Sequence, residues 1–382
     1  MAIYLDHAAS TPVHPDAAAA MHEIHCDPLL MANPSSTHAS GREVKARLND
    51  FRARVARRFE CEPASVIFNS GGTEGDNHAL LGMLGSDPSG KHLLISAIEH
   101  EAVWEMAHHL QRRGLKLSIA PVNEHGETDL EFVEDLLLSE RPDAVSVMAV
   151  NNETGVVQPV RELAAICSEN QIPFHSDCVR VVGHGLEEII TDGNIYLLNG
   201  TAHKFGGPRG CGVLIDRRRM LPPYSFGGGH EHGLRSGTEN LAGIAGLTLA
   251  LELADREHAV KVETLRKYLE TQIMRRLPAS VIHGSGAIRA THITSVAFPG
   301  HTAAFMQPWL SERGCFVGTG SACHEGAAKG SRVLRAMGVP LELDMATLRI
   351  SLGWNTKLIE LDAFLTHLEA CLQAEHSLAG SA

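Results

Sequence analysis

The first half of the chain alternates short apolar runs with amphipathic helical stretches. Apolar residues at spacings of three and four predict one buried helical face: Val44, Leu48, Phe51, Val55 and Phe59. Five apolar runs predict buried strands: VIF (66–68), HLLIS (92–96), AVSVMAV (144–150), IPFHS (172–176) and IYLLNG (195–200). Because these runs are almost continuously apolar and are separated by helices, we expect a mostly parallel sheet that is covered on both faces.

The pattern changes after about residue 250. Apolar residues at spacings of three and four predict two helices here. The first is a long helix with Leu265, Leu269, Ile273 and Leu277. The second is a closing helix with Leu361, Phe364, Leu368 and Leu372. Short strand-like runs lie between them. We therefore expect an α/β fold with a large domain over residues 15–250 and a smaller α+β domain formed by residues 1–14 and 251–382.

Composition narrows the class of protein. The 382 residues are 44% hydrophobic and 20% charged, which is usual for a soluble globular protein. The net charge of -12 argues against binding to nucleic acid or to an anionic membrane. No apolar stretch reaches the ~20 residues of a membrane span, and the first residues, MAIYLDHAAS, lack the pattern of a signal peptide. Eight scattered cysteines without a CxxC pair suit a reducing cytoplasm, where we expect the protein to act.

Candidate chemistry lies just past the strands, where open α/β sheets bind their ligands. The stretch NSGGTEGDN (69–77) follows the first strand with small residues, the Thr73 hydroxyl and a predicted helix N-terminus. Exposed backbone N–H groups at such a place can hold a phosphate. A glycine-rich turn by itself is as often only a tight turn, so this stretch needs support from elsewhere in the chain.

Two further strand ends supply that support. Asp177 follows the strand IPFHS, and Lys204 lies in TAHKFGGPRG (201–210) after the next strand. Alone, the acid would be a helix cap and the lysine a surface residue. Together with the phosphate cradle they are the set that pyridoxal 5′-phosphate needs: a phosphate anchor, a carboxylate for the pyridine nitrogen and an amine for the Schiff base. We therefore predict a pyridoxal-phosphate site.

Ten stretches in order carry a family resemblance: YLDHAASTPVHP (4–15), NPSSTHASGR (33–42), SGGTEGDN (70–77), EHEAV (99–103), NNETGVVQ (151–158), HSDCVRVVG (175–183), HKFGGPRG (203–210), GGGHEHGLRSGT (227–238), GSAC (320–323) and LRISLG (348–353). Over nearly its whole length the chain resembles the NifS/IscS-like cysteine desulfurases, fold-type I pyridoxal-phosphate enzymes of the class V aminotransferase family. This resemblance implies a large domain with a mostly parallel seven-stranded sheet, a small domain with the catalytic cysteine loop, and a homodimer.

The resemblance also implies roles for single residues. Lys204 would carry the cofactor, Asp177 would face the pyridine nitrogen and His100 would stack on the ring. Asn152 would lie near the ring hydroxyl and the substrate, and Arg349 would bind the substrate carboxylate. The phosphate would be held by Gly72, Thr73, Thr201 and His203, with Thr238 reaching in from the other subunit. No metal is expected in this site.

Cys323 would be the nucleophile of the reaction. A thiolate there can take the sulfur of L-cysteine as a persulfide, leave L-alanine, and pass the sulfur to a protein acceptor or an iron–sulfur scaffold. Possible uses are iron–sulfur cluster assembly, tRNA thiolation or another thio-product. The other seven cysteines are expected to be structural thiols.

This chain departs from the family's usual residues at three places. Arg180 stands where glutamine is usual, His7 where tyrosine is usual, and Thr201 where serine is common. The Arg180 guanidinium could lie against the ring oxygen and stabilise its charge, or turn away to pair with a carboxylate or a loop carbonyl.

Two alternatives remain from the sequence. One is a related pyridoxal-phosphate lyase that acts on selenocysteine or another amino acid, for which Cys323 would be dispensable. The other is a metal-binding or scaffold protein, suggested by 23 histidines and by HEH (230–232). The absence of HEXXH and of paired CxxC motifs argues against the second.

Overall fold

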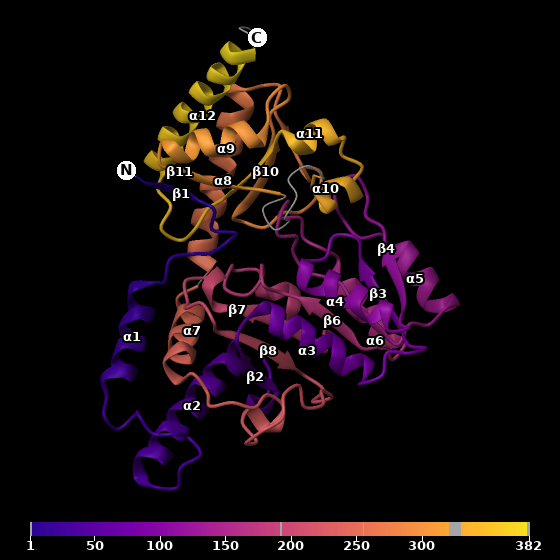
Figure 1. Ribbon diagram of the computed structural model, residues 1–382, viewed down its shortest axis with the longest axis vertical. Coiled ribbons are helices and arrows are strands. Elements are labelled where there is room, and N and C mark those ends of the chain that lie inside the picture. The colour runs from indigo at the N-terminus through magenta and orange to yellow at the C-terminus, as the bar shows by residue number, and fades with distance from the viewer. Residues whose placement is uncertain (1, 192, 255, 321–329, 380–382) are drawn as a thin grey trace.

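A computed structural model describes residues 2–191, 193–254, 256–320 and 330–379 (Figure 1). The described strands form two sheets, one of seven strands and one of five. In Figure 1 the five-stranded sheet, with the C-terminal helix, lies above the seven-stranded one. Among the described residues, no helix combines the length and the apolar character that a membrane span requires.

The seven-stranded sheet is mostly parallel, as predicted. Its order is β2 (Val66–Asn69), β8 (Gly212–Asp216), β7 (Leu197–Thr201), β6 (Phe174–Asp177), β5 (Ala144–Ser146), β3 (His92–Ser96) and β4 (Lys116–Ala120). Only β8 runs antiparallel to its neighbours within this sheet. As a result, β2, β3, β5, β6 and β7 all end at the same edge of the sheet.

Helices cover both faces of this sheet because alternate strand residues are apolar on each side. On one face, Leu94, Val145 and Leu198 pack in a core with the predicted helical face of α2 (Ala39–Arg58). On the other face, Leu93 and Ile95 pack against helices α3 (Gly72–Leu84) and α4 (Glu101–Arg112). The remaining helices of this part are α1 (Pro15–Cys26), α5 (Leu130–Ser139), α6 (Val160–Glu169) and α7 (Leu241–Leu253).

The five-stranded sheet has the order β1 (Ile3–Leu5), β11 (Cys315–Thr319), β12 (Thr347–Ser351), β10 (Ile293–Ala297) and β9 (Val281–Ile282). Its core includes residues of α8 (Arg256–Arg276), α9 (Ala303–Glu312) and α12 (Leu358–Ala379). Two short helices, α10 (Arg332–Ala336) and α11 (Leu341–Met345), precede β12. Since β1 pairs with β11, the first residues of the chain belong to this second sheet. The two cores support the two-domain division 15–250 and 1–14 with 251–382, which we keep as a proposal.

The sequence pattern missed two strands of the first sheet and overextended one. Strand β4 lies at the sheet edge, where its first four residues are partly exposed or exposed and no apolar run forms. Strand β8 is fully buried, but it begins with Gly212 directly after the glycine-rich loop, so its short apolar run was not recognised as a separate strand. Strand β5 ends at Ser146, although the amides of Val147 and Ala149 still donate to carbonyls of the neighbouring β6 segment.

A buried ion pair attaches the loop before α7 to the first sheet. Arg52 on α2 donates from both terminal nitrogens to Glu231, at 2.7 and 2.6 Å. The same carboxylate accepts the backbone N–H of Phe68 on β2 at 2.8 Å. Both charged residues are at least 95% buried. Because each charge is desolvated, the pair depends on the presence of both partners.

Replacing Arg52 with methionine should lower the free energy of unfolding by about 3–5 kcal/mol, because Glu231 is left buried without a counterion. The double variant Arg52→Met/Glu231→Gln should recover part of that loss. Urea denaturation measures both. Arg47→Met is the matched control, since Arg47 pairs with Glu43 at an exposed site where the expected loss is below ~1 kcal/mol. Equal losses for Arg47→Met and Arg52→Met would contradict this assignment.

Candidate active site

A cavity with about 500 Å³ of empty volume opens at the carboxyl edge of the first sheet. Its lining consists of Gly72, Thr73, Asp76, His100, Met148, Asn152, Asp177, Val179, Arg180, Thr201, His203 and Lys204. The fold thus brings together nine of the twelve predicted site residues from five different strand ends.

The turn between β2 and α3 forms one wall of the cavity. Gly71 has φ 147° and precedes a helix whose N-terminus carries no side-chain cap. A Cβ at Gly71 would lie 3.2 Å from the Thr201 Oγ1 atom, and one at Gly72 would lie 2.8 Å from the Val179 side chain. Glycines are therefore required here for the close approach of the three segments. The result is a small cradle of backbone N–H groups and hydroxyls.

Buried acids form the floor of the cavity. Asp177 ends β6, is 5% exposed, and accepts the Val179 N–H at 2.9 Å. Burial raises the pKa of Asp76, and the charges of Asp177 and Glu99 raise it further. Burial likewise raises the pKa of Glu99 to about 8, so that this carboxyl is protonated at neutral pH. Asn199 links the floor to the phosphate-type cradle, because its Nδ2 donates to Asp76 at 2.8 Å and to the Gly72 carbonyl at 3.1 Å.

His100 is a neutral ring at the start of α4. Its Nδ1 accepts the Ala102 N–H at 3.1 Å, so the proton of the neutral ring is on Nε2. Burial lowers the pKa of His100; Asp177 opposes that shift, whereas Arg180 and Lys204 add to it. The side chain therefore offers a flat, uncharged face and one N–H donor to the cavity.

Lys204 follows β7 in the short 3-10 helix Ala202–Lys204. Its Nζ donates to the carbonyls of Ala8 and Ala9, at 3.0 and 2.7 Å. The neighbouring His203 contacts Ser10 Oγ through Nδ1 at 3.2 Å, and burial lowers the pKa of His203 to about 4. The chain just after β1 therefore orients both residues.

Arg180 is 4% exposed, lines the cavity, and donates from Nη2 to the Ala8 carbonyl. Arg180 thus donates to a loop carbonyl and at the same time lines the cavity, and its position against the ring oxygen of a bound cofactor stays a prediction. The same carbonyl accepts from Lys204, so two cationic side chains converge on one backbone oxygen.

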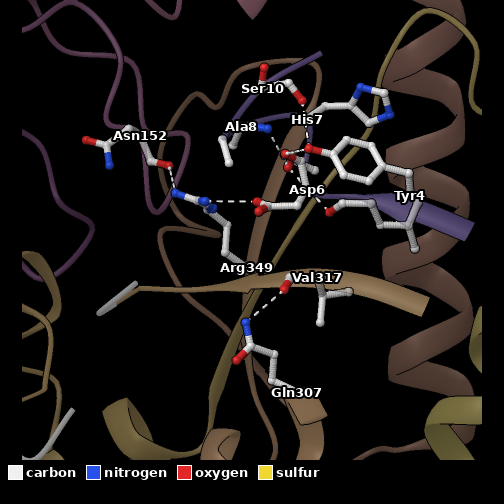
Figure 2. A network of polar contacts seen from close by, with 12 residues as sticks. Tyr4, Asp6, His7, Ala8, Ser10, Asn152, Gln307, Val317 and Arg349 are labelled. Carbon is white, nitrogen blue, oxygen red and sulfur yellow. Dashed lines mark hydrogen bonds and ion pairs between the residues drawn. The ribbon is translucent and has the colours of Figure 1, made fainter. Parts of the chain in front are cut away.

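Arg349 lies at the rim of the cavity rather than in its lining. From β12 it donates through Nη1 to the Asn152 carbonyl at 3.2 Å and through Nη2 to Asp6 at 2.9 Å (Figure 2). The guanidinium is thereby attached to a segment that lines the cavity. Its contact with Asp6 was not anticipated.

Two predicted residues are not brought into the cavity by this chain. Thr238 is exposed, and its hydroxyl accepts from Asn33 Nδ2 at 3.4 Å. Cys323 lies outside the described residues. Among the other cysteines, Cys167, Cys178, Cys211, Cys315 and Cys371 are buried, as expected of structural thiols. The expectation is wrong for Cys26, which ends α1 on the surface with its Sγ 3.5 Å from His22 Nε2.

Sequence reasoning missed Asp76, Met148 and Val179 in the lining. Asp76 was detectable in principle, because it lies one helical turn beyond Gly72 on the same face of α3. The ligand atoms of Asp76, His100 and Asp177 lie within 4.8 Å of one another, which is close enough for a metal ion. The expectation of no metal therefore stays a prediction.

Comparison with known proteins places this geometry in a family. Residues 3–364 match the family described as Aminotransferase class-V. A protein of Dictyoglomus turgidum named cysteine desulfurase IscS is 35% identical over 97% of this chain and 94% of its own length. A protein of the same name from Methanosarcina thermophila is 35% identical over 92% of this chain and 87% of its own length.

Solved structures agree with these relatives. A NifS-like protein superimposes with a TM-score of 0.87 at 32% identity, covering 98% of this chain and 100% of its own. SspA in complex with cysteine superimposes with a TM-score of 0.79 at 28% identity, covering 91% of this chain and 98% of its own. The chain described here therefore belongs to the class-V aminotransferase family and, within it, to the NifS/IscS-like cysteine desulfurases.

Proposed function

We propose that this enzyme uses pyridoxal 5′-phosphate to convert L-cysteine to L-alanine and carries the released sulfur on Cys323 as a persulfide. One observation carries the proposal: a single cavity unites Lys204, Asp177 and His100 with a glycine cradle at the strand ends. The near full-length similarity to proteins named cysteine desulfurase supports it. So does a structural relative whose title reports a complex with cysteine.

The residues fit the cofactor. Gly71 and Gly72 leave free the space that a Cβ would fill beside Thr201 and Val179, as a phosphate cradle requires. Gly72, Thr73, Thr201 and His203 would hold the phosphate, Asp177 the pyridine nitrogen, and His100 and Asn152 the ring. When bound, pyridoxal 5′-phosphate supplies an electron sink that weakens the Cα–H and Cβ–S bonds of an amino acid.

The chain's own side chains would do the rest. The Lys204 amine, oriented by two carbonyls, holds or moves a proton at the substrate Cα position. Neutral His100 offers its Nε2–H as a hydrogen-bond donor near the same place. Arg349 binds the substrate carboxylate at the rim, where its guanidinium is 95% buried and therefore strongly interacting.

In the proposed sulfur transfer, each bond that breaks is matched by one that forms. The Cys323 thiol loses its proton, and the thiolate attacks the sulfur of L-cysteine. The substrate Cβ–S bond breaks while an S–S bond forms on Cys323, and the carbon gains a proton to become the methyl group of L-alanine. The persulfide sulfur then passes to an acceptor thiol. Protein acceptors, an iron–sulfur scaffold among them, and a cytoplasmic location are part of this proposal.

A homodimer would complete the site. Thr238 lies outside the cavity of its own chain, next to Asn33. The segments that carry these residues also expose large apolar side chains, with Leu29 at 63%, Met31 at 83% and Phe226 at 89% exposure. Exposed apolar side chains on neighbouring loops are typical of a protein interface. A second copy that covers them would bring its Thr238 towards the phosphate cradle.

Lys204→Ala should remove the borohydride-stable attachment of pyridoxal 5′-phosphate, because no amine is left at that position to react with its aldehyde. Mass spectrometry of reduced, digested protein measures the attachment. Lys267→Ala, which removes an exposed amine on α8, is the control and should leave it intact. Attachment at another lysine in the Lys204→Ala protein would show that the assignment is wrong.

Cys323→Ala should bind L-cysteine but carry no persulfide, and its sulfide release should fall roughly 100-fold or more. Persulfide labelling and a sulfide assay measure the two effects. Cys26→Ala, which removes the exposed thiol on α1, should behave as the wild type. Wild-type sulfide release by Cys323→Ala would favour the alternative of a lyase that does not need this thiol.

Glu153 should make stability depend on pH. It is buried, accepts from Ser331 Oγ at 2.6 Å, and would lie 2.6 Å from a Cβ at Gly320, so it contacts both flanks of the segment that contains Cys323. Burial, opposed by that hydrogen bond, Arg349 and Arg332, raises its pKa from 4.5 to about 7. A raised carboxyl pKa means that the protonated folded form is favoured. Its stabilisation is fully present below pH 4.5 and is lost as the pH rises through about 7.

Glu153→Gln should therefore match the wild type in stability at pH 5 and exceed it at pH 8, by about 1.4 kcal/mol per unit of pKa shift. Denaturation midpoints between pH 5 and pH 8 measure the difference. Glu99→Gln offers a second buried carboxyl with a raised pKa for comparison. Parallel curves for wild type and Glu153→Gln would mean that Glu153 stays ionised in the folded protein.

A further inference from the structure

Arg349 already has a carboxylate partner within its own chain. Its Nη2 donates to Asp6 Oδ1 at 2.9 Å, and Figure 2 shows the two side chains pointing towards each other. Arg349 is 6% exposed in its side chain and Asp6 is 23% exposed. The two groups therefore form a charge-assisted hydrogen bond, in which the guanidinium is buried and the carboxylate is in part exposed to solvent.

The donors of Arg349 are limited in number and in access. Nη1 is engaged with the Asn152 carbonyl at 3.2 Å. Nε is buried and has no hydrogen-bond partner among the described residues. Gly318 on β11 packs against the pair, since a Cβ there would lie 2.8 Å from Asp6 Oδ1 and 2.9 Å from Nη2. A carboxylate that arrives from the cavity side therefore meets a guanidinium whose Nη1 and Nη2 each already donate one of their two N–H groups, and whose positive charge already has Asp6 as its partner.

The backbone of Asp6 is fixed, whereas its side chain has space to move. The Asp6 carbonyl accepts from the Tyr4 hydroxyl at 3.1 Å and from the Ala9 N–H at 2.9 Å. Its side chain also lines an open cavity with about 1060 Å³ of empty volume, bounded by Tyr4, Gln307, Phe316 and others. Rotation about the two side-chain torsions of Asp6 would carry the carboxylate towards that water-accessible space.

We propose that Asp6 is a displaceable counterion of Arg349. It holds the guanidinium in place while no substrate is bound, and it yields Nη2 to the carboxylate of an entering amino acid. Because L-cysteine and L-alanine carry the same carboxylate, Asp6 competes with both, and it takes the guanidinium back when L-alanine leaves. This inference rests on the proposed function, in which Arg349 binds the substrate carboxylate.

Removing the charge of Asp6 should strengthen binding of amino acids. In Asp6→Asn an amide oxygen of similar size still accepts from Nη2, but the hydrogen bond loses the charge of its acceptor. Bonds between two charged groups are stronger than those with a neutral partner by about 1 kcal/mol or more. An entering carboxylate therefore has less to displace, and the dissociation constant of L-alanine should fall roughly five- to tenfold.

Calorimetric titration of the pyridoxal 5′-phosphate-loaded enzyme with L-alanine tests the proposal. The proteins compared are wild type, Asp6→Asn, Asp6→Glu and Arg349→Ala, with Asp16→Asn as the control for loss of an exposed acid. Asp6→Asn should bind five- to tenfold more tightly, Asp6→Glu and Asp16→Asn should remain near the wild type, and Arg349→Ala should bind far more weakly. If Asp6→Asn does not fold, Asp6→Ser replaces it with the same expectation.

Unchanged or weaker binding by Asp6→Asn, with weak binding by Arg349→Ala, would overturn the counterion proposal and leave Arg349 as the carboxylate site. Wild-type affinity in Arg349→Ala would instead overturn the role of Arg349 in the proposed function. The two failures are therefore distinguishable in one set of titrations.

Discussion

The backbone turn between β1 and α1 contacts Lys204, Arg180 and Arg349, three cationic side chains in or beside the cavity. The Ala8 carbonyl accepts from both Lys204 and Arg180, and the Ala9 carbonyl accepts from Lys204 as well. Carbonyl dipoles orient cations without cancelling their charge, which a carboxylate at the same place would do. Two residues earlier, the Asp6 side chain pairs with Arg349. Displacing this turn would therefore disturb the amine and both guanidinium groups together.

The turn keeps its place because it is bonded to both sheets. Ser351 on β12 accepts the Ala8 N–H through its hydroxyl at 2.7 Å. On the other side, Thr11 bonds to the carbonyls of His203 and Lys204, at 2.8 and 3.1 Å. A contact that spans the two cores in this way couples their relative positions to the geometry of the site. Small movements of one sheet relative to the other would therefore change the positions of Lys204 and Arg349.

The charged side chains of the cavity are largely buried, so they interact in a medium of low dielectric constant. Burial raises the pKa of Glu99 to about 8 and lowers that of His203 to about 4, so both side chains are neutral at pH 7. Burial also raises the pKa of Asp76 and lowers that of His100, so these two lining residues are likewise shifted towards their neutral forms beside Arg180, Lys204 and Asp177. Interactions with a bound anion are stronger under such conditions than at a solvated surface.

Much of this site could be predicted from the sequence because its residues follow apolar runs. Asp177 and Thr201 are the last residues of their strands and Lys204 lies in the short helix that follows Thr201, and the strands share one carboxyl edge. The partnership of Asp6 with Arg349 could not be predicted in this way, since register between distant strands leaves no local signal. The partner of Arg180 could not be predicted either, because its acceptor is the backbone carbonyl of Ala8, which is distant in sequence. Thr238 lies outside the cavity of its own chain, and its role at the phosphate belongs to the homodimer that we propose.

The distance along the chain between the turn and its partners has a consequence for biosynthesis. Ala8 and Ser351 are separated by 343 residues, so the turn leaves the ribosome long before the strand that fixes it. Folding proceeds from the N-terminal side during synthesis, and the first sheet is complete at Asp216. A nascent chain at that point has Lys204 but neither β12 nor Arg349. The cavity can therefore be finished only after β12 has been synthesised, which delays the appearance of a reactive amine in a correctly oriented pocket.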